Sequence, residues 1–128
     1  MNKKFIQLAA LFAALTVGMG AFAAHQLKNI FDLSLLQVFE TAVKYQFYHA
    51  LALLVTGILY QQFPNKFLQW AGNLFITGIL LFSGSLYLLC FIKYQHISAN
   101  WVGAITPIGG LCFIAGWVLM ALSVSKKL

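Results

Sequence analysis

Four long apolar stretches, separated by short polar segments, dominate the chain. They run over about residues 5–24, 45–61, 67–92 and 101–124. Each meets or nearly meets the roughly 17 to 20 apolar residues that a helix needs to cross a bilayer. Strands of a membrane barrel alternate apolar and polar residues, whereas these runs are continuous. The pattern therefore predicts an all-α protein: a bundle of four transmembrane helices forming a single integral membrane domain over residues 1–128.

The segment between the first two spans, residues 25–44, has its own helical pattern. Ser34 is followed three residues later by Gln37, which fits a capping box and predicts a helix start near Leu35. This helix either lies at the membrane interface or runs directly into the second span, and we expect an interfacial helix. The other connections are short: "FPNK" at 63–66 predicts a turn, and "YQHISAN" at 94–100 joins the last two spans.

The composition supports a membrane protein and excludes a nucleic-acid binder. Hydrophobic residues make up 62% of the chain and charged residues 8%, too few to cover a soluble globule. All eight basic residues are lysines, and they sit at the ends of the apolar runs, which is typical of topology signals. With four spans, one side carries Lys3, Lys4, Lys66, Lys126 and Lys127, and the other carries Lys28, Lys44 and Lys93. We therefore expect a bacterial cytoplasmic membrane protein with both termini in the cytoplasm.

The first span also has features of a cleavable signal peptide. Two lysines precede the apolar run, and Ala21-Phe22-Ala23 fits the small-residue pattern of a cleavage site. The run is about 20 residues long, whereas the apolar region of a signal peptide has about 7 to 15. Cleavage would also place the termini on opposite sides of the membrane. We therefore expect the first span to be retained.

Histidines are the first candidates for chemistry. His25 ends the first span, His49 lies just inside the second, and His96 follows the third, so all three are expected near one membrane face. Imidazoles at one depth can bind a metal or haem, which makes His25 and His49 candidate metal ligands. The alternative is that they make structural hydrogen bonds. The cysteines, Cys90 and Cys112, are expected at different depths and are interpreted as packing residues.

A second group of candidates surrounds the only glutamate. Glu40 and Lys44 are four residues apart in the order that favours an ion pair, and Tyr45 and Tyr48 follow. A carboxylate near the interface can engage a partner or relay protons. The alternative is an ordinary ion pair beside a belt of interfacial aromatic residues.

Two further features lie in the third and fourth spans. Asn73, Ser83 and Ser85 are polar positions in span three that either line a pore or let helices pack closely and hydrogen-bond. Pro107, within "GAITPIGG", is expected to free the carbonyl of Gly103 and to kink span four. Broken helices form substrate sites in transporters, so Pro107 is a candidate gate.

Four blocks carry a resemblance to a known family. They are "GAFAAH" at 20–25, "VFETAVKYQFYHAL" at 38–51, "GILLFSGSLYLL" at 78–89 and "GAITPIGGLCFIAGW" at 103–117. In this order they resemble the domain of unknown function 423 family, which includes transmembrane protein 256 of animals. The resemblance implies a four-helix membrane protein without an assigned activity, and it implies that the GAFAAH block belongs to the retained chain.

These observations favour a non-enzymatic function. The sequence has no nucleophile–base pattern, phosphate loop or carboxylate cluster, so we predict that the protein is not an enzyme, and we predict no cofactor. The leading hypothesis is an interaction or assembly factor whose partners are the lipid bilayer and either another membrane protein or a second copy. The alternatives are a small oligomeric transporter or channel, and a metal- or haem-binding redox accessory.

Overall fold

The computed structural model of the chain describes residues 1–98 and 100–125, and all regular structure in these ranges is helical. The elements are α1 (Lys3–His25), a 3-10 helix η1 (Leu27–Asn29), α2 (Leu33–Leu59), α3 (Lys66–Gly78), a π-helical segment η2 (Ile79–Ser83), α4 (Gly84–Tyr94), α5 (Asn100–Gly103) and α6 (Ile105–Ser125). In this part of the chain, four helical stretches are long and apolar enough to cross a membrane. The prediction of an all-α membrane protein with four spans is confirmed.

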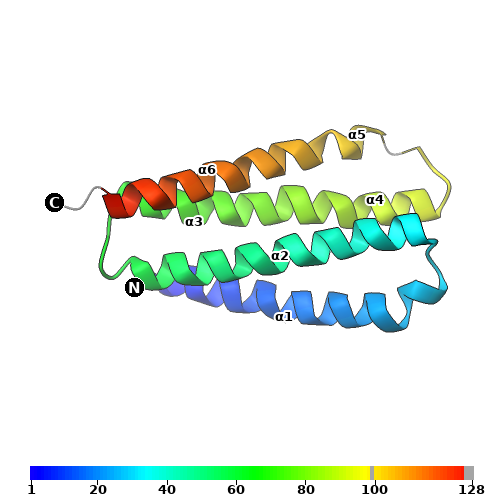
Figure 1. Ribbon diagram of the computed structural model, residues 1–128, viewed down its shortest axis with the longest axis horizontal. Coiled ribbons are helices and arrows are strands. Elements are labelled where there is room, and N and C mark those ends of the chain that lie inside the picture. The colour runs from blue at the N-terminus through cyan, green and yellow to red at the C-terminus, as the bar shows by residue number, and fades with distance from the viewer. Residues whose placement is uncertain (99, 126–128) are drawn as a thin grey trace.

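The helices lie side by side along the long axis of the molecule (Figure 1). The start of α1, the end of α6 and the α2–α3 connection (residues 60–65) lie at one end, which we call the terminal end. The α1–α2 connection (residues 26–32) and residues 95–98 lie at the other, which we call the loop end. The expected arrangement of four antiparallel spans therefore agrees with the structure. Lys126 and Lys127, which entered the predicted orientation, lie outside the described residues.

Side-chain caps explain where three of the helices begin. Asn2 caps α1 by accepting from the Phe5 N–H, and Asn65 caps α3 by accepting from the Leu68 N–H at 3.0 Å. The "FPNK" turn is therefore confirmed, with Asn65 as the cap. Asp32 caps α2 by accepting from the Leu35 N–H at 2.8 Å. The helix start lies within two residues of the predicted one, but the cap is Asp32 rather than Ser34.

The expected interfacial helix is not a separate element, which corrects that part of the prediction. Residues 33–44 form the first three turns of α2, which continues without a break to Leu59. The α1–α2 connection contains only the single turn of η1. The correction has a physical reason, because residues 33–56 contain neither proline nor glycine after the Asp32 cap.

Span four is interrupted rather than kinked. Helix α5 ends at Gly103, and α6 begins at Ile105, with the Ala104 N–H bonded to the Trp101 carbonyl at 3.3 Å. Pro107 therefore lies in the first turn of α6, where a missing N–H costs little because it would have no intrahelical partner. The proline agrees with the predicted break, but it starts a helix instead of bending one.

Two apolar clusters hold the helices together. One fills the terminal half and the middle, with Phe5, Leu53, Phe75 and Phe113 among its buried members. The other lies toward the loop end and contains Ala23, Leu27, Phe31, Phe39 and Cys90.

Glycine permits a close approach of α6 to the backbone of η2. A Cβ atom on Gly109 of α6 would lie 2.8 Å from the backbone carbon of Leu81 and the Cα of Phe82. Helix α6 therefore touches the backbone of η2 directly.

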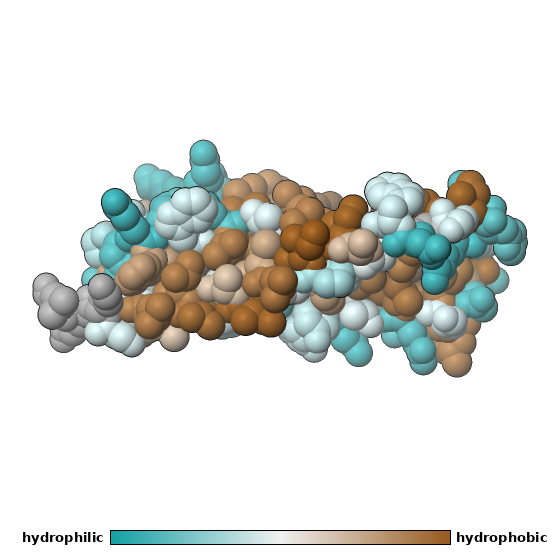
Figure 2. All heavy atoms as spheres, turned by 90° about the horizontal axis from the view of Figure 1, so that it is seen from above, coloured by the Kyte–Doolittle hydropathy of each residue, from teal (hydrophilic) through white to brown (hydrophobic). Residues whose placement is uncertain are grey.

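The outer surface is apolar over the middle of the molecule. Large side chains such as Leu11, Leu80, Leu111 and Ile114 are each at least 60% exposed. Figure 2 shows hydrophobic atoms over the middle of the length and hydrophilic atoms gathered toward both ends. This is the surface expected of a protein whose middle contacts lipid chains and whose ends contact headgroups and water.

Candidate functional site

His49 is a buried member of α2, with 4% of its surface exposed. Its Nδ1 lies 2.8 Å from the Tyr45 carbonyl, and its Nε2 lies 3.0 Å from Trp117 Nε1 on α6. An indole N–H can only donate, so His49 Nε2 is the acceptor, and Nδ1 carries the proton that is donated to Tyr45. The ring also stacks on Phe113, with centroids 3.5 Å apart and planes 9° apart. His49 is therefore a neutral side chain that joins α2 to α6.

The three histidines do not meet. His25 is exposed at the last residue of α1, and His96 is exposed in the turn after α4, where its φ of 61° is left-handed. His49 lies sixteen residues beyond the start of α2, roughly 24 Å along the helix. The expectation that all three share one membrane face is corrected for His49, since residues 33–44 form part of the same continuous helix and not a separate interfacial one.

The candidate metal ligands His25 and His49 are likewise separate. Among the described residues, no group of three or more histidine, cysteine or acidic side chains is arranged to hold a metal. A metal at His49 Nε2 would displace the Trp117 bond. Cys90, which is buried, and Cys112, which is partly buried, are both free.

A polar bridge next to His49 was not singled out in the sequence as a site. Gln46, which is 4% exposed, donates to the Phe12 carbonyl of α1 at 3.0 Å. Its Oε1 accepts from the Tyr87 hydroxyl of α4 at 2.7 Å. One glutamine thus ties three spans together. The signal in the sequence was a glutamine inside an apolar run, which is costly in a membrane unless its amide is bonded.

The polar residues of span three are divided by the π-helical segment. Ser83 donates to the Ala42 carbonyl of α2 at 2.7 Å, and Ser85 bonds the Thr106 hydroxyl of α6. Asn73 is only partly buried, and its carbonyl accepts from its own helix neighbour Thr77. The wider π turn shifts the helical register, so polar residues before and after it do not follow a single 3.6-residue spacing. Ser83 and Ser85 join helices, as the close-packing interpretation expects.

Glu40 and Lys44 border a shallow groove between α1 and α2. The groove has a volume of about 260 Å³ and is lined by Gly20, Ala23, Ala24, Glu40, Val43 and Lys44. Both charged side chains are exposed, and they do not form the expected ion pair. An exposed pair gains little from pairing and loses side-chain entropy, which accounts for the correction.

The two tyrosines that follow are placed differently from the charged pair. Tyr45 is 39% exposed, and its ring lies against Phe82 of η2, with centroids 4.8 Å apart. Tyr48 is 53% exposed and contacts Tyr45, with centroids 5.7 Å apart. Of the four candidates in this segment, the structure therefore brings only Glu40 and Lys44 to the groove.

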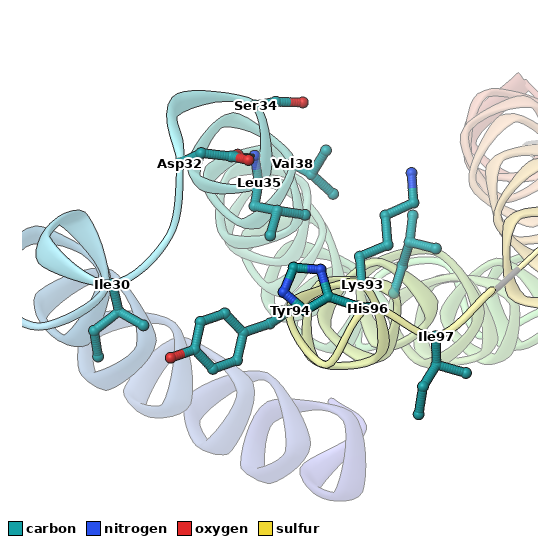
Figure 3. Close-up of a pocket in the computed structure, with 10 residues that line it drawn as sticks. Ile30, Asp32, Ser34, Leu35, Val38, Lys93, Tyr94, His96 and Ile97 are labelled. Atoms are coloured by element: carbon teal, nitrogen blue, oxygen red, sulfur yellow. Dashed lines mark hydrogen bonds between the residues drawn. The ribbon is translucent and has the colours of Figure 1, made fainter.

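A larger pocket lies at the loop end, between the start of α2 and the end of α4 (Figure 3). Its volume is about 510 Å³, and its lining combines aliphatic and charged side chains: Ile30, Asp32, Ser34, Leu35, Val38, Leu89, Lys93, Tyr94, His96 and Ile97. The sequence analysis missed this loop-end pocket. Its parts come from segments about 60 residues apart, and no local spacing connects them.

Comparison with known proteins agrees with this architecture. The model of family DUF423, described as a protein of unknown function, matches residues 19–110. The chain belongs to this family. The resemblance seen in the four sequence blocks is therefore confirmed.

The relatives extend over nearly the whole chain. A UPF0382 membrane protein of Staphylococcus haemolyticus is 43% identical over 124 residues, which is 97% of this chain and 97% of the relative. Another, from Staphylococcus saprophyticus, is 44% identical over 97% of this chain and 98% of its own length. A third, from Schizosaccharomyces pombe, is 40% identical over 88% of this chain and 94% of its own. No solved structure matches the chain. The names agree with an integral membrane protein.

Proposed function

We propose that this protein is a non-enzymatic membrane protein that binds a transmembrane helix of a partner protein in the groove between α1 and α2. The observation that carries the proposal is the state of Glu40 and Lys44. Both are exposed at the rim of the groove, and neither is paired with the other.

The hydrogen bonding of polar groups inside the bundle supports a binding site on the surface of the bundle and not in its interior. Among the described residues, no buried side-chain nitrogen or oxygen lacks a hydrogen-bond partner. A site for a polar substrate inside the bundle would need free donors or acceptors, because a buried polar ligand must recover the hydrogen bonds it loses on leaving water. The interior polar groups are occupied with holding helices together, whereas the charges at the groove are available.

The floor of the groove suits a helix. Gly20, Ala23 and Ala24 carry little or no side chain, and small residues allow two helix backbones to approach closely in a membrane. Glu40 lies seven residues after the start of α2, roughly 10 Å along the helix, so it is near the edge of the hydrocarbon layer. An ionised carboxylate at that depth is stabilised by a basic partner. The partner helix therefore carries small residues at the crossing point and a lysine or arginine opposite Glu40.

Site-specific photo-crosslinking in native membranes tests the proposal. A photoreactive residue placed at Ala24, in the groove, should give one discrete adduct with a second membrane protein. The crosslinked peptide should belong to an apolar helix with a basic residue. The substitution Glu40→Gln, which removes the charge but keeps the shape, should lower the yield of this adduct.

The matched control is the same photoreactive residue at Leu11. Leu11 is also on α1 and is 61% exposed, but it does not line the groove. It should crosslink only to lipid. If positions 11 and 24 gave the same protein adducts, or if position 24 gave none, the groove would not be a partner site.

We also propose that both termini face the cytoplasm of a bacterial cell. The support is the excess of lysine on the terminal side of the sequence, five against three. Single cysteines introduced at Gln62 and at Ile97, which are exposed at opposite ends, report the orientation. A membrane-impermeant thiol reagent added to intact cells should label position 97. Labelling of position 62 instead would reverse the orientation.

A further inference from the structure

The loop-end pocket is larger than the groove, and charged side chains from two different helices line it. It is about 510 Å³ in volume, which is within the usual range of roughly 300 to 1,000 Å³ for sites of small ligands. We propose that it binds the headgroup of a zwitterionic phospholipid, with the phosphate at Lys93 and His96 and the ammonium group at Asp32.

The charges of the pocket call for a ligand that carries both signs. One oxygen of Asp32 accepts from the Leu35 N–H at 2.8 Å, but within the described part of the chain its carboxylate has no ion-pair partner. The Lys93 ammonium is likewise without an ion pair there. In Figure 3, Leu35 and Val38 lie between Asp32 and Lys93, and the His96 ring lies below them. A purely anionic ligand would meet Asp32 and a purely cationic one would meet Lys93, whereas a zwitterion matches both.

The start of α2 does not itself hold the phosphate, because its cap is a carboxylate. The first N–H groups of a long helix carry a partial positive charge that attracts anions. Here Asp32 occupies the capping position and neutralises that charge in part. Lys93, at the end of α4, supplies the remaining positive charge. The phosphate is therefore expected on the α4 side of the pocket and the ammonium group on the α2 side.

The apolar part of the lining favours a lipid over a soluble zwitterion. Leu35, Val38 and Leu89 lie on the parts of α2 and α4 that continue into the membrane-spanning region. They provide aliphatic contact for the first methylene groups of an acyl chain below the headgroup.

Depth agrees with this occupant. Helix α2 has 27 residues, so it is roughly 40 Å long, whereas the hydrocarbon core is about 30 Å thick. At least one end of α2 must therefore reach the headgroup layer. The pocket is at its charged, capped end. Tyr94 on the rim packs against Phe31, with ring centroids 5.5 Å apart, as interfacial tyrosines commonly do.

Native mass spectrometry of the full chain in mild detergent tests the proposal. The protein is titrated with phosphatidylethanolamine or phosphatidylglycerol of identical acyl chains, so that only the headgroup charge differs. The wild type should retain phosphatidylethanolamine preferentially. Lys93→Gln should weaken its binding about tenfold, the change expected for one charge-assisted hydrogen bond.

The substitution Asp32→Asn separates charge from structure. Asparagine is as good a helix cap as aspartate, so α2 should start normally while the negative charge is lost. The preference for phosphatidylethanolamine over phosphatidylglycerol should then fall about tenfold, because the ammonium group loses its partner. Lys28→Gln is the control, since Lys28 is exposed at the same end but does not line the pocket. It should leave both affinities unchanged.

Three results would overturn the inference. Equal retention of the two lipids by the wild type would mean that the pocket does not distinguish the charge of the headgroup. Equal weakening by Lys28→Gln and Lys93→Gln would mean that binding depends on general surface charge. Displacement of the bound lipid by free phosphoethanolamine at similar concentration would identify a soluble ligand rather than a lipid.

Discussion

The interior of the bundle and its loop end use polar residues in opposite ways. The interior polar set consists of Gln46, His49, Ser83, Ser85 and Tyr87, and every member has a hydrogen-bond partner on another helix. The charges outside this set are Asp32 and Lys93 at the loop-end pocket and Glu40 and Lys44 at the groove near the same end, and none of them forms an ion pair within the described residues. The first set fixes how the spans pack, while the second remains available to a ligand or partner.

The difference follows from the solvent at each depth. In the hydrocarbon layer an unbonded polar group costs several kcal/mol, so a polar side chain there is bonded to its own protein. At the headgroup level water and lipid satisfy the same groups, so charges can stay unpaired at little cost. Bonded polar side chains in the interior thus indicate a structural role, and unpaired charges near the loop end indicate a binding site.

The largest expected effect tests the close contact between α6 and η2 in the interior. The substitution Gly109→Ala places a Cβ against backbone atoms of Leu81 and Phe82 that cannot move aside. We expect it to lower the free energy of unfolding by about 3 kcal/mol, the upper range for overpacking. Thermal unfolding in detergent, followed by circular dichroism, measures the change.

The matched control is Gly18→Ala on α1. A Cβ on Gly18 would meet nothing within 4 Å, so this substitution should be neutral or stabilise the helix by up to about 1 kcal/mol. Similar losses at the two positions would indicate that helix propensity, and not the approach of α6, sets the effect.

A smaller effect is expected from the histidines, which divide between the two regions. The substitution His49→Phe retains an aromatic ring against Phe113 but leaves the Trp117 N–H without its acceptor. The unfolding free energy should fall by about 2 kcal/mol, within the range for a donor left without a partner away from water. His25→Phe, at the exposed end of α1, should change it by less than about 0.5 kcal/mol.

The free energies of unfolding of the two histidine variants, measured in bicelles of the same composition, decide whether His49 has a structural role. An unchanged stability for His49→Phe would leave its burial unexplained by packing. A loss at His25 as large as that at His49 would mean that His25 has a partner in the membrane that the bundle itself does not supply.

The sequence predicted the architecture because membrane insertion depends on local composition. Each span is a continuous apolar run, and its ends are defined by nearby residues such as Asn65 and by the lysines. The start of α2 was predicted to within two residues, but a separate interfacial helix was expected where the structure has one longer span. Which of the two forms depends on how residues 33–44 pack against other helices, as Phe39 does in the cluster at the loop end.

The candidate sites could be predicted only in part, because they are formed by contacts across the fold. His49 was selected as a candidate metal ligand, but its hydrogen-bond partner Trp117 is 68 residues away in the sequence. The loop-end pocket joins Asp32 to Lys93, and neither was selected. The spacing of Glu40 and Lys44 suggested an ion pair that the structure does not form. The transporter and redox alternatives stay predictions.

The smallest expected effect is found when one pair of side chains from each region is compared directly. In the interior, the Tyr87 hydroxyl donates to Gln46 Oε1 at 2.7 Å, and at the groove Glu40 and Lys44 are four residues apart but unpaired. A double-mutant cycle of Gln46→Leu and Tyr87→Phe should give a coupling of about 0.6 kcal/mol, the average for hydrogen bonds between membrane helices. A cycle of Glu40→Gln and Lys44→Gln should give a coupling near zero.

Both cycles are measured by reversible unfolding in bicelles. The coupling energy of a cycle separates the pair from other contacts, such as the bond from Gln46 to the Phe12 carbonyl. The second cycle matters most for function. A coupling of about 0.5 kcal/mol or more between Glu40 and Lys44 would mean that they pair in the membrane. The groove would then offer no free charge to a partner helix, and the contrast between the two regions would hold only for Asp32 and Lys93.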